Sequence, residues 1–262
     1  MATAISVLGR PLWYELMTTD MAAAEAFYKP VVGWTTAPFD GAGQPYSMWN
    51  RADGTPMGGV MTLPDELKAH KIPPHWMMYV GVNKLEDAVA HAKRLGGSTV
   101  SDVIEVPDVG RMQVLKDPQG AAFYVYEPGP QPQAPDGPPA IGDTSWIELY
   151  TTDSEAAMKF YGDLFGWKPT ESMDMGQMGV YRMFGRSGTS MGGMMNKTPD
   201  MAHIPNSWLP YFRVPDVHAA ADRIKAHGGR VIMGPMEVPG GSWILQAQDP
   251  QGGTFALHHV KA

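Results

Sequence analysis

Apolar and polar positions alternate along residues 12–18, and apolar residues then recur at helical spacing at Ala23, Ala26, Phe27 and Tyr28. The first pattern predicts a strand and the second a helix. In the strand, Trp13, Glu15 and Met17 share one face. Asp20 stands where a helix N-cap is expected, and Gly33 stands where the helix should end. The chain is therefore expected to begin with a strand and a helix.

Three shorter strand patterns follow, at residues 34–37, 46–50 and 57–62, and turns rich in Gly, Pro, Asn and Asp separate them. After a loop at residues 64–74 the series starts again. It predicts a strand at 76–82, a helix at 85–95 and strands at 100–106, 111–115 and 121–126. The first half of the chain should thus hold two units of the order βαβββ.

The eight residues from Trp13 to Asp20 return, with six of them unchanged, as the residues from Trp146 to Asp153. A tandem duplication explains this repeat, and it predicts a first domain at 1–127, a Pro-rich linker at 128–142 and a second domain at 143–262. Expected in the second half are a strand at 146–151, a helix after Asp153, a strand at 211–214 and a helix at 217–227. Four βαβββ units result.

The composition excludes several classes of protein. A net charge of -7 and a pI near 5.6 give no basic surface for nucleic acid or an anionic membrane. With no cysteine among 262 residues there is no disulfide and no thiolate ligand or nucleophile. The first residues lack the pattern of an export signal, and no apolar run is long enough to span a membrane. We expect a soluble cytoplasmic protein, a monomer or a homodimer.

Three motifs occur in both halves: Trp-x-Glu-Leu-x-Thr-Thr-Asp, a Phe-Tyr pair followed by Gly-Trp, and an Asp-Pro-Gln-Gly turn at 117–120 and 249–252. Together they resemble the vicinal oxygen chelate superfamily, which includes glyoxalase I, bleomycin resistance proteins and extradiol dioxygenases. The resemblance covers nearly the whole chain outside the linker. It implies an α+β fold of two tandem glyoxalase-like domains, in which two βαβββ units form one cupped mixed sheet.

The resemblance also implies a divalent metal in each cup, held by four His, Glu or Gln side chains. The matching positions carry other residues: Trp13, Met77, Tyr124 and one of 57–61 in the first domain, and Trp146, Leu209, Ala256 and one of 191–195 in the second. Such side chains are poor ligands for a hard cation. The sequence therefore predicts no metal and no cofactor. A register shift of two would bring Glu15 and Glu148 into play, and His75, His258 and His259 are further donors.

We predict that the cups bind a small, partly apolar organic molecule. The glutamates would accept a cationic group, and the tryptophans on the same strands would stack on a flat ring. The predicted ligand-binding residues are Trp13, Glu15, Met57, Tyr124, Trp146, Glu148 and Met191.

Other interpretations stay open. The glutamates could brace the fold, the methionines could fill the core, and Trp34 and Trp167 are expected to pack there. The alternative function is a metal-dependent glyoxalase-like lyase or dioxygenase, with catalytic residues that the sequence does not identify. A third is an interaction or structural role in which only one cup, or neither, is open.

Overall fold

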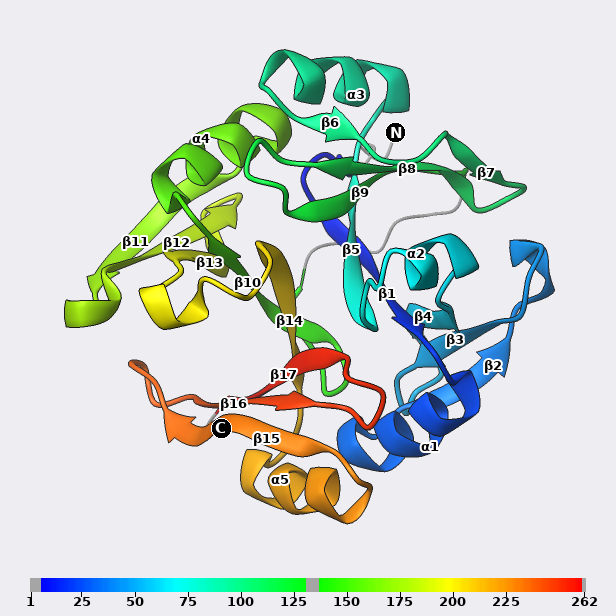
Figure 1. The fold of residues 1–262 in the computed structure, drawn as a ribbon, viewed down its shortest axis with the longest axis vertical. Coiled ribbons are helices and arrows are strands. Elements are labelled where there is room, and N and C mark those ends of the chain that lie inside the picture. Colours follow the sequence, from blue (N-terminus) through cyan, green and yellow to red (C-terminus); the bar gives the residue numbers. More distant parts are fainter. Residues whose placement is uncertain (1–5, 131–136, 261–262) are drawn as a thin grey trace. The chain divides into compact units, whose positions relative to one another are not determined.

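The computed structural model describes residues 6–130 and 137–260 (Figure 1). The first half consists of β1 (Pro11–Thr18), α1 (Met21–Val32), β2 (Thr35–Pro38), β3 (Tyr46–Asn50), β4 (Pro56–Thr62), α2 (Asp65–Ala69), β5 (His75–Gly81), α3 (Leu85–Arg94), β6 (Ser98–Thr99), β7 (Ile104–Val106), β8 (Gly110–Lys116) and β9 (Ala122–Pro128). The second half consists of β10 (Thr144–Thr151), α4 (Ser154–Phe165), β11 (Lys168–Asp174), β12 (Val180–Arg186), β13 (Thr189–Asn196), β14 (Ser207–Arg213), α5 (Val217–Ala226), β15 (Arg230–Glu237), β16 (Trp243–Gln248) and β17 (Thr254–His259).

The strands form two mixed sheets, one for each half of the sequence. The strand orders are β2-β3-β4-β1-β5-β9-β8-β6, with β7 beside β8, and β11-β12-β13-β10-β14-β17-β16-β15. Within each βαβββ unit the first strand runs parallel to the last, as in β1 with β4 and β10 with β13. The remaining pairs within a unit are antiparallel. The predicted α+β class and the fourfold βαβββ order are confirmed.

The helix boundaries follow from capping residues. Asp20 Oδ1 accepts a hydrogen bond from the Ala23 backbone N–H at 2.9 Å, and Asp153 caps α4 in the same way. Gly33 ends α1 with a φ of 93°, a left-handed conformation that glycine adopts without a Cβ clash. Both N-caps and this exit were predicted from the sequence.

Three boundaries differ from the sequence prediction. The loop at 64–74 contains α2, because Asp65 and Glu66 favour a helix N-terminus and Lys68 pairs with Asp65 at 2.9 Å. Of the strand expected at 100–106, only 104–106 forms a strand, β7, and the short β6 lies before the predicted start, since the Val114 N–H donates to the Ser101 hydroxyl instead of to a strand carbonyl. Strand β14 begins at Ser207, four residues before the predicted start.

Contacts between Cα atoms divide the chain into two compact units that each combine both halves of the sequence. One consists of the described parts of Met1–Leu12, Met78–Gly137 and Ile147–Trp208, and the other of Trp13–Met77, Pro138–Trp146 and Leu209–Ala262. We call them the middle unit and the terminal unit. The domain limits at 127 and 143 stay a prediction, and residues 131–136 of the predicted linker lie outside the described residues.

The core of the terminal unit is an aromatic cluster around Tyr28. Its hydroxyl accepts from Trp76 Nε1 at 3.1 Å and donates to Asp249 Oδ2 at 2.9 Å. Burial raises the pKa values of both the tyrosine and the aspartate. Asp249 belongs to the second Asp-Pro-Gln-Gly turn, so a residue of the first half is bonded to a residue 221 positions away. The cluster comprises Phe27, Tyr28, Trp34, Trp49, Trp76, Phe212 and Phe255.

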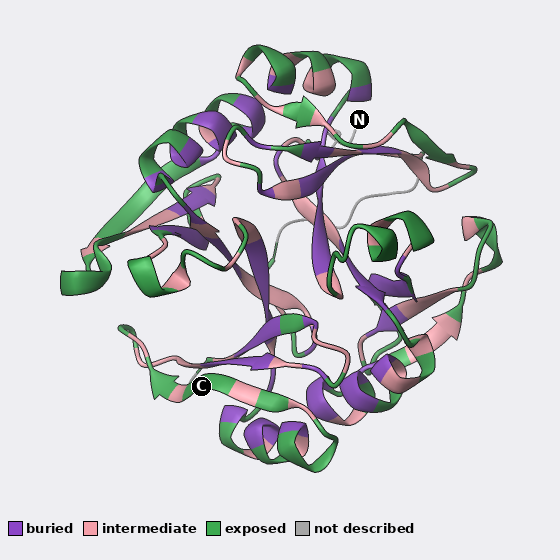
Figure 2. Cartoon of the chain, in the orientation of Figure 1, coloured by how far each residue is buried: buried purple, intermediate pink, exposed green. Residues whose placement is uncertain are grey.

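The core of the middle unit repeats this arrangement with the halves exchanged. Tyr161 of α4 accepts from Trp208 Nε1 at 3.0 Å and donates to Asp117 Oδ2, in the first Asp-Pro-Gln-Gly turn, at 3.0 Å. Trp34 and Trp167 are 3% and 1% exposed, which confirms their predicted place in the core. In Figure 2 the helices α1 and α4 are buried along one side only. Among the described residues, no helix is long and apolar enough to cross a membrane.

Candidate functional site

Glu15 is a buried carboxylate on the first strand, with 4% of the residue exposed. Strand β4 runs parallel to β1 and places Gly59 beside Glu15. A Cβ on Gly59 would lie 2.0 Å from the Tyr46 hydroxyl, so the tyrosine occupies the space that the glycine leaves open. That hydroxyl accepts a hydrogen bond from Trp13 Nε1 at 2.8 Å. Because side chains alternate along a strand, Glu15 and Trp13 belong to one face, which we call the glutamate face.

The second domain repeats this arrangement. Glu148, which is 7% exposed, lies beside Gly193 on the parallel pair β10 and β13. A Cβ on Gly193 would lie 2.1 Å from the Tyr181 ring. The Tyr181 hydroxyl donates to Glu148 Oε2 at 2.9 Å. Trp146 is half-buried on β10, two residues before Glu148, and therefore lies on the glutamate face of the second domain.

Methionines flank the two glycines on the same strands. Met57 and Met61 alternate with Gly59 along β4 and are 7% and 6% exposed. In the second domain Met191 is half-buried and Met195 is 8% exposed. A thioether side chain is flexible and polarisable, so it adapts to irregular neighbours. The face in each domain therefore combines one carboxylate and one hydroxyl with carbon and sulfur atoms.

Tyr124 lies on β9 beside Tyr79 of β5, and their rings stack with centroids 3.9 Å apart. In the second domain the corresponding pair on β14 and β17 is Tyr211 with Ala256. The Tyr211 hydroxyl accepts from Gln246 Nε2 at 2.8 Å, and both residues are buried. The two domains thus have different side chains at this position.

Two of the positions that the resemblance implies for a divalent metal carry Met77 and Tyr124. Both residues are buried, and neither is a usual ligand of such an ion. Within residues 6–130 and 137–260, no group of three or more His, Cys, Asp or Glu side chains could hold a metal. Glu15 and Glu148 each bring one carboxylate to the glutamate face.

The three histidines that the sequence offered as donors have other contacts. His75 Nδ1 lies 2.8 Å from the Pro73 carbonyl oxygen. His258 Nδ1 lies 2.8 Å from the Ser145 hydroxyl, and burial, with the charges of Arg213 and His259, lowers the pKa of His258 to about 4. His259 pairs with Trp243 across β16 and β17. The imidazole of His258 is therefore neutral at pH 7.

Tyr46 and Tyr181 are the site residues that sequence reasoning missed. Tyr46 lies 13 positions before Gly59, and Tyr181 lies 12 positions before Gly193. Neither tyrosine belongs to the repeated eight-residue stretches at 13–20 and 146–153. The signal that could have found them is the glycine pair itself. A glycine within a strand often marks a close approach by another group, and here that group is the tyrosine hydroxyl.

Comparison with known proteins agrees with the fold and the motifs. Residues 144–257 match the model of the Glyoxalase/Bleomycin resistance protein/Dioxygenase superfamily, and residues 14–126 match that of a Glyoxalase-like domain. The chain is 31% identical over 254 residues to the putative glyoxylase CFP32 of Mycobacterium tuberculosis, covering 95% of this chain and 94% of that protein. The chain belongs to this superfamily, the vicinal oxygen chelate superfamily.

Two further similarities concern one sequence relative and one solved structure. The anthracycline biosynthesis protein DauV of Streptomyces sp. strain C5 is 29% identical over 266 residues, which cover 97% of this chain and 94% of the relative. The crystal structure of the 2,3-dioxygenase LapB from Pseudomonas sp. KL28 superposes with a TM-score of 0.67 at 14% identity, covering 98% of this chain and 94% of LapB. At that identity LapB shows the fold of the superfamily alone.

Proposed function

We propose that this superfamily member binds a small, flat organic molecule that carries a cationic or hydrogen-bond-donating group, and that it does so without a metal. The observation that supports this most is the buried Glu148 carboxylate with the Tyr181 hydroxyl 2.9 Å away, above Gly193, and the same residue types around Glu15. A buried carboxylate is costly unless it is paired. An arrangement kept in both domains is suited to a ligand with a complementary donor.

The glutamate supplies the polar contact. An ionised carboxylate has about four lone-pair sites, so it can accept from a tyrosine and from a ligand at the same time. A hydrogen bond from a charged amine would be shorter and about twice as strong as one between neutral groups. We therefore assign the cationic group of the ligand to Glu15 in the first domain and to Glu148 in the second.

Trp13 supplies the stacking surface in the first domain. Its hydrogen bond to Tyr46 fixes the indole by its nitrogen, so the ring plane is set before a ligand arrives. An aromatic ligand stacked on a fixed indole loses little side-chain entropy of the protein on binding. Trp146 has this role in the second domain, and Met57 and Met191 adapt to the ligand's outline. Tyr124, stacked on Tyr79, would border the first site.

The relatives support this class of ligand. DauV is named for anthracycline biosynthesis. An anthracycline has flat fused rings and an amino sugar, so it is a suitable probe of the proposed site. The name of the superfamily includes bleomycin resistance proteins. The rival function, a metal-dependent lyase or dioxygenase, requires ligands that the glutamate faces do not bring together.

A titration of the purified chain with an anthracycline, followed by calorimetry, tests the proposal. We expect Trp13→Ala or Glu15→Gln to weaken binding at the first site by about tenfold or more, the equivalent of one hydrogen bond to a charged group. Glu148→Gln should do the same at the second site. The combined Glu15→Gln and Glu148→Gln variant should lose most of the binding heat.

Trp243→Ala is the matched control. Trp243 is also half-buried, but it packs on His218 at 4.8 Å, lies three strands from β10 in the strand order, and belongs to the sheet that does not contain Glu15. It should bind like the original protein. If Trp13→Ala and Glu15→Gln bind every aromatic amine tested as the original chain does, these residues do not form the site and the proposal is wrong.

A further inference from the structure

A groove of about 520 Å³ lies in the terminal unit, apart from the residues of the two glutamate faces. Its walls come from the end of α1, the turn between β3 and β4, the segment 140–142, Pro215 just before α5, and Arg223 in the last turn of α5. The volume is in the range of small-molecule sites. The lining is mostly apolar, with Val32, Ile141 and Pro215 among it, and it includes the side chains of Arg51, Asp53 and Arg223.

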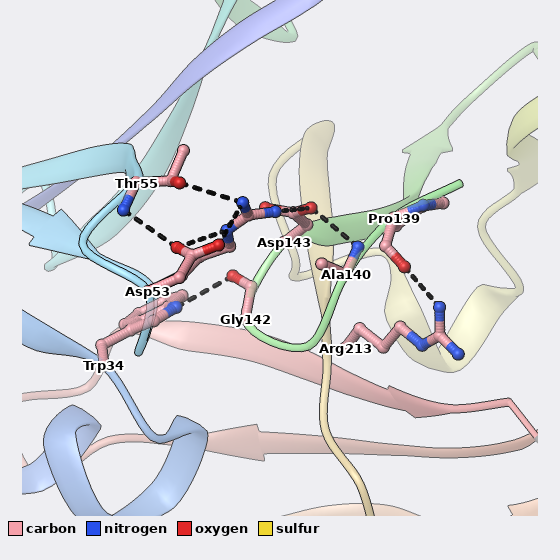
Figure 3. A network of polar contacts seen from close by, with 9 residues as sticks. Trp34, Asp53, Thr55, Pro139, Ala140, Gly142, Asp143 and Arg213 are labelled. Atoms are coloured by element: carbon pink, nitrogen blue, oxygen red, sulfur yellow. Dashed lines mark hydrogen bonds and ion pairs between the residues drawn. The ribbon is translucent and has the colours of Figure 1, made fainter. Parts of the chain in front are cut away.

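One wall of the groove is held rigidly. The Ala140 N–H donates to Asp143 Oδ2 at 2.8 Å, and the Gly142 carbonyl accepts from Trp34 Nε1 at 2.9 Å (Figure 3). The Gly142 N–H donates to the Arg213 carbonyl at 2.8 Å. Ile141, between these anchors, nevertheless remains 45% exposed. An apolar side chain fixed in this way presents a formed contact surface to a ligand.

The two arginines of the groove differ in their partners. Arg51 is neutralised by two carboxylates, because it pairs with Asp53 at 2.8 Å and with Asp143 at 2.7 Å. Arg223 makes no ion pair with any residue that the structure describes. Its one hydrogen bond, from Nη2 to the Val31 carbonyl, is long at 3.3 Å. Its Nε is buried with no acceptor among the described residues. A guanidinium has five donors, so most of them lack a partner here.

We infer that this groove is a second binding site, specific for a small monocarboxylate with an apolar body. The carboxylate of the ligand would pair with the Arg223 guanidinium. Arginine commonly binds a carboxylate through two parallel hydrogen bonds. The body would lie against Ile141, Val32 and Pro215, which are apolar. Arg51 stays with its own two carboxylates, so one anionic group per ligand is accommodated.

A structural role alone explains less of this arrangement. Arg223 contacts the last turn of α1, where a cation offsets the negative end of the helix dipole. That contact uses a single donor. The contact of Arg223 with α1 also does not explain why Ile141, on a hydrogen-bonded segment of the same groove, is exposed. The two roles make different predictions, because helix capping changes stability and not the affinity for an anion.

Calorimetric titration of the full chain with phenylacetate tests the inference, with phenylacetamide as the neutral analogue of the same shape. We expect the acid to bind with a dissociation constant of about 1 mM or below, and the amide to bind about tenfold more weakly. Arg223→Gln should weaken binding of the acid by about tenfold and leave that of the amide unchanged. Inorganic phosphate should not compete, because it lacks the apolar body.

Lys225→Gln is the matched control, since it removes the same charge from an exposed position on the same helix. It should leave the titration unchanged. Should Arg223→Gln unfold the protein, Ile141→Glu places a like charge at the exposed rim without removing an internal contact, and it should abolish binding of the acid. Equal binding of acid and amide, equal binding by Arg223→Gln and the original chain, or no binding of phenylacetate at about 10 mM would each overturn the inference. None of these outcomes concerns Glu15 or Trp13, so the proposed function is tested separately.

Discussion

At the scale of single residues, a tyrosine hydroxyl joins a tryptophan to an aspartate in each core. Tyr28 does this for Trp76 and Asp249, and Tyr161 repeats it in the middle unit. Both partners are buried, so neither can turn to water if the hydroxyl is lost. A buried donor or acceptor left without a partner costs about 1 to 3 kcal/mol.

We therefore expect Tyr28→Phe to lower the free energy of unfolding by about 1 to 3 kcal/mol, because it leaves the Trp76 N–H and an Asp249 oxygen without their partner. Tyr161→Phe should have a similar cost. Urea unfolding followed by fluorescence measures both. A loss under about 0.5 kcal/mol, the size of an ordinary surface substitution, would contradict this account of the cores.

His258 gives a pH dependence whose sign follows from its environment. Its pKa falls to about 4 in the folded chain, against an ordinary value of 6.5, so the unfolded chain binds the extra proton between these values. Its contribution to stability is therefore full above pH 6.5 and is lost as the pH falls toward 4. His258→Gln should reduce the loss of unfolding free energy between pH 7 and 5.

Urea unfolding at both pH values supplies the comparison. The assignment is wrong if His258→Gln shows the same slope as the original protein.

The sequence predicted residues whose role is local and missed those that depend on strand register. Asp20 and Asp153 were identified as caps because a cap bonds within three residues of itself. Tyr46 and Tyr181 were missed, since their contacts depend on which strands pair and with what offset. The ligand-binding roles of Glu15 and Trp13 stay predictions.

At the scale of the elements, the parallel pairs β1–β4 and β10–β13 each contain two adjacent glycines with opposite surroundings. A Cβ on Gly58 would meet the Tyr14 carbonyl oxygen at 2.2 Å, and one on Gly192 would meet that of Ile147 at 2.3 Å. The neighbouring Gly59 and Gly193 instead face tyrosine side chains. The carbonyl group cannot move away without breaking hydrogen bonds between the parallel strands. The end of a tyrosine side chain, by contrast, can rotate away.

Gly58→Ala should therefore be more destabilising than Gly59→Ala, by about 1 to 3 kcal/mol, as expected when an added methyl meets packed backbone. Gly59→Ala should mainly displace Tyr46 and weaken ligand binding at the first glutamate face. Thermal unfolding and the anthracycline titration, run on both variants, separate the two effects. Equal stability of the two variants would contradict the assignment of these faces.

Helices and strands were predicted correctly where one apolar periodicity dominated. The predicted boundaries were wrong where a single side chain or a short polar segment determines the structure. Ser101 replaces a strand carbonyl as acceptor, which no periodicity reveals. Helix α2 is five residues long and polar, so it has no apolar period to detect. The four long α-helices follow directly from the sequence, as do the N-caps Asp20 of α1 and Asp153 of α4.

At the scale of the whole molecule, the repeat predicted two tandem domains but not how the cores are assembled. Each compact unit joins βαβββ segments from both halves of the sequence, as helix α1 packs on α5 and Phe27 contacts Phe255. The two Tyr–Asp bonds link residues 221 and 44 positions apart. Duplication leaves matching motifs in both halves, and sequence alone does not say which copy packs on which.

A chain of residues 1–137 should consequently lack a cooperative core as a monomer, because Tyr28 and Phe27 would lose Asp249 and Phe255. Near-ultraviolet circular dichroism should show little signal for it. Mixing it with residues 138–262 should restore the signal. A monomeric 1–137 fragment that unfolds cooperatively on its own would contradict the shared cores.

The most direct test of the central claim is the affinity of one aromatic amine, an anthracycline, for the protein before and after removal of divalent metal by a chelator. Because the glutamate faces do not gather a set of metal ligands, the account predicts dissociation constants equal within about twofold, and no change on adding Mn(II). Binding that disappears on chelation and returns with a stoichiometric divalent ion would contradict it.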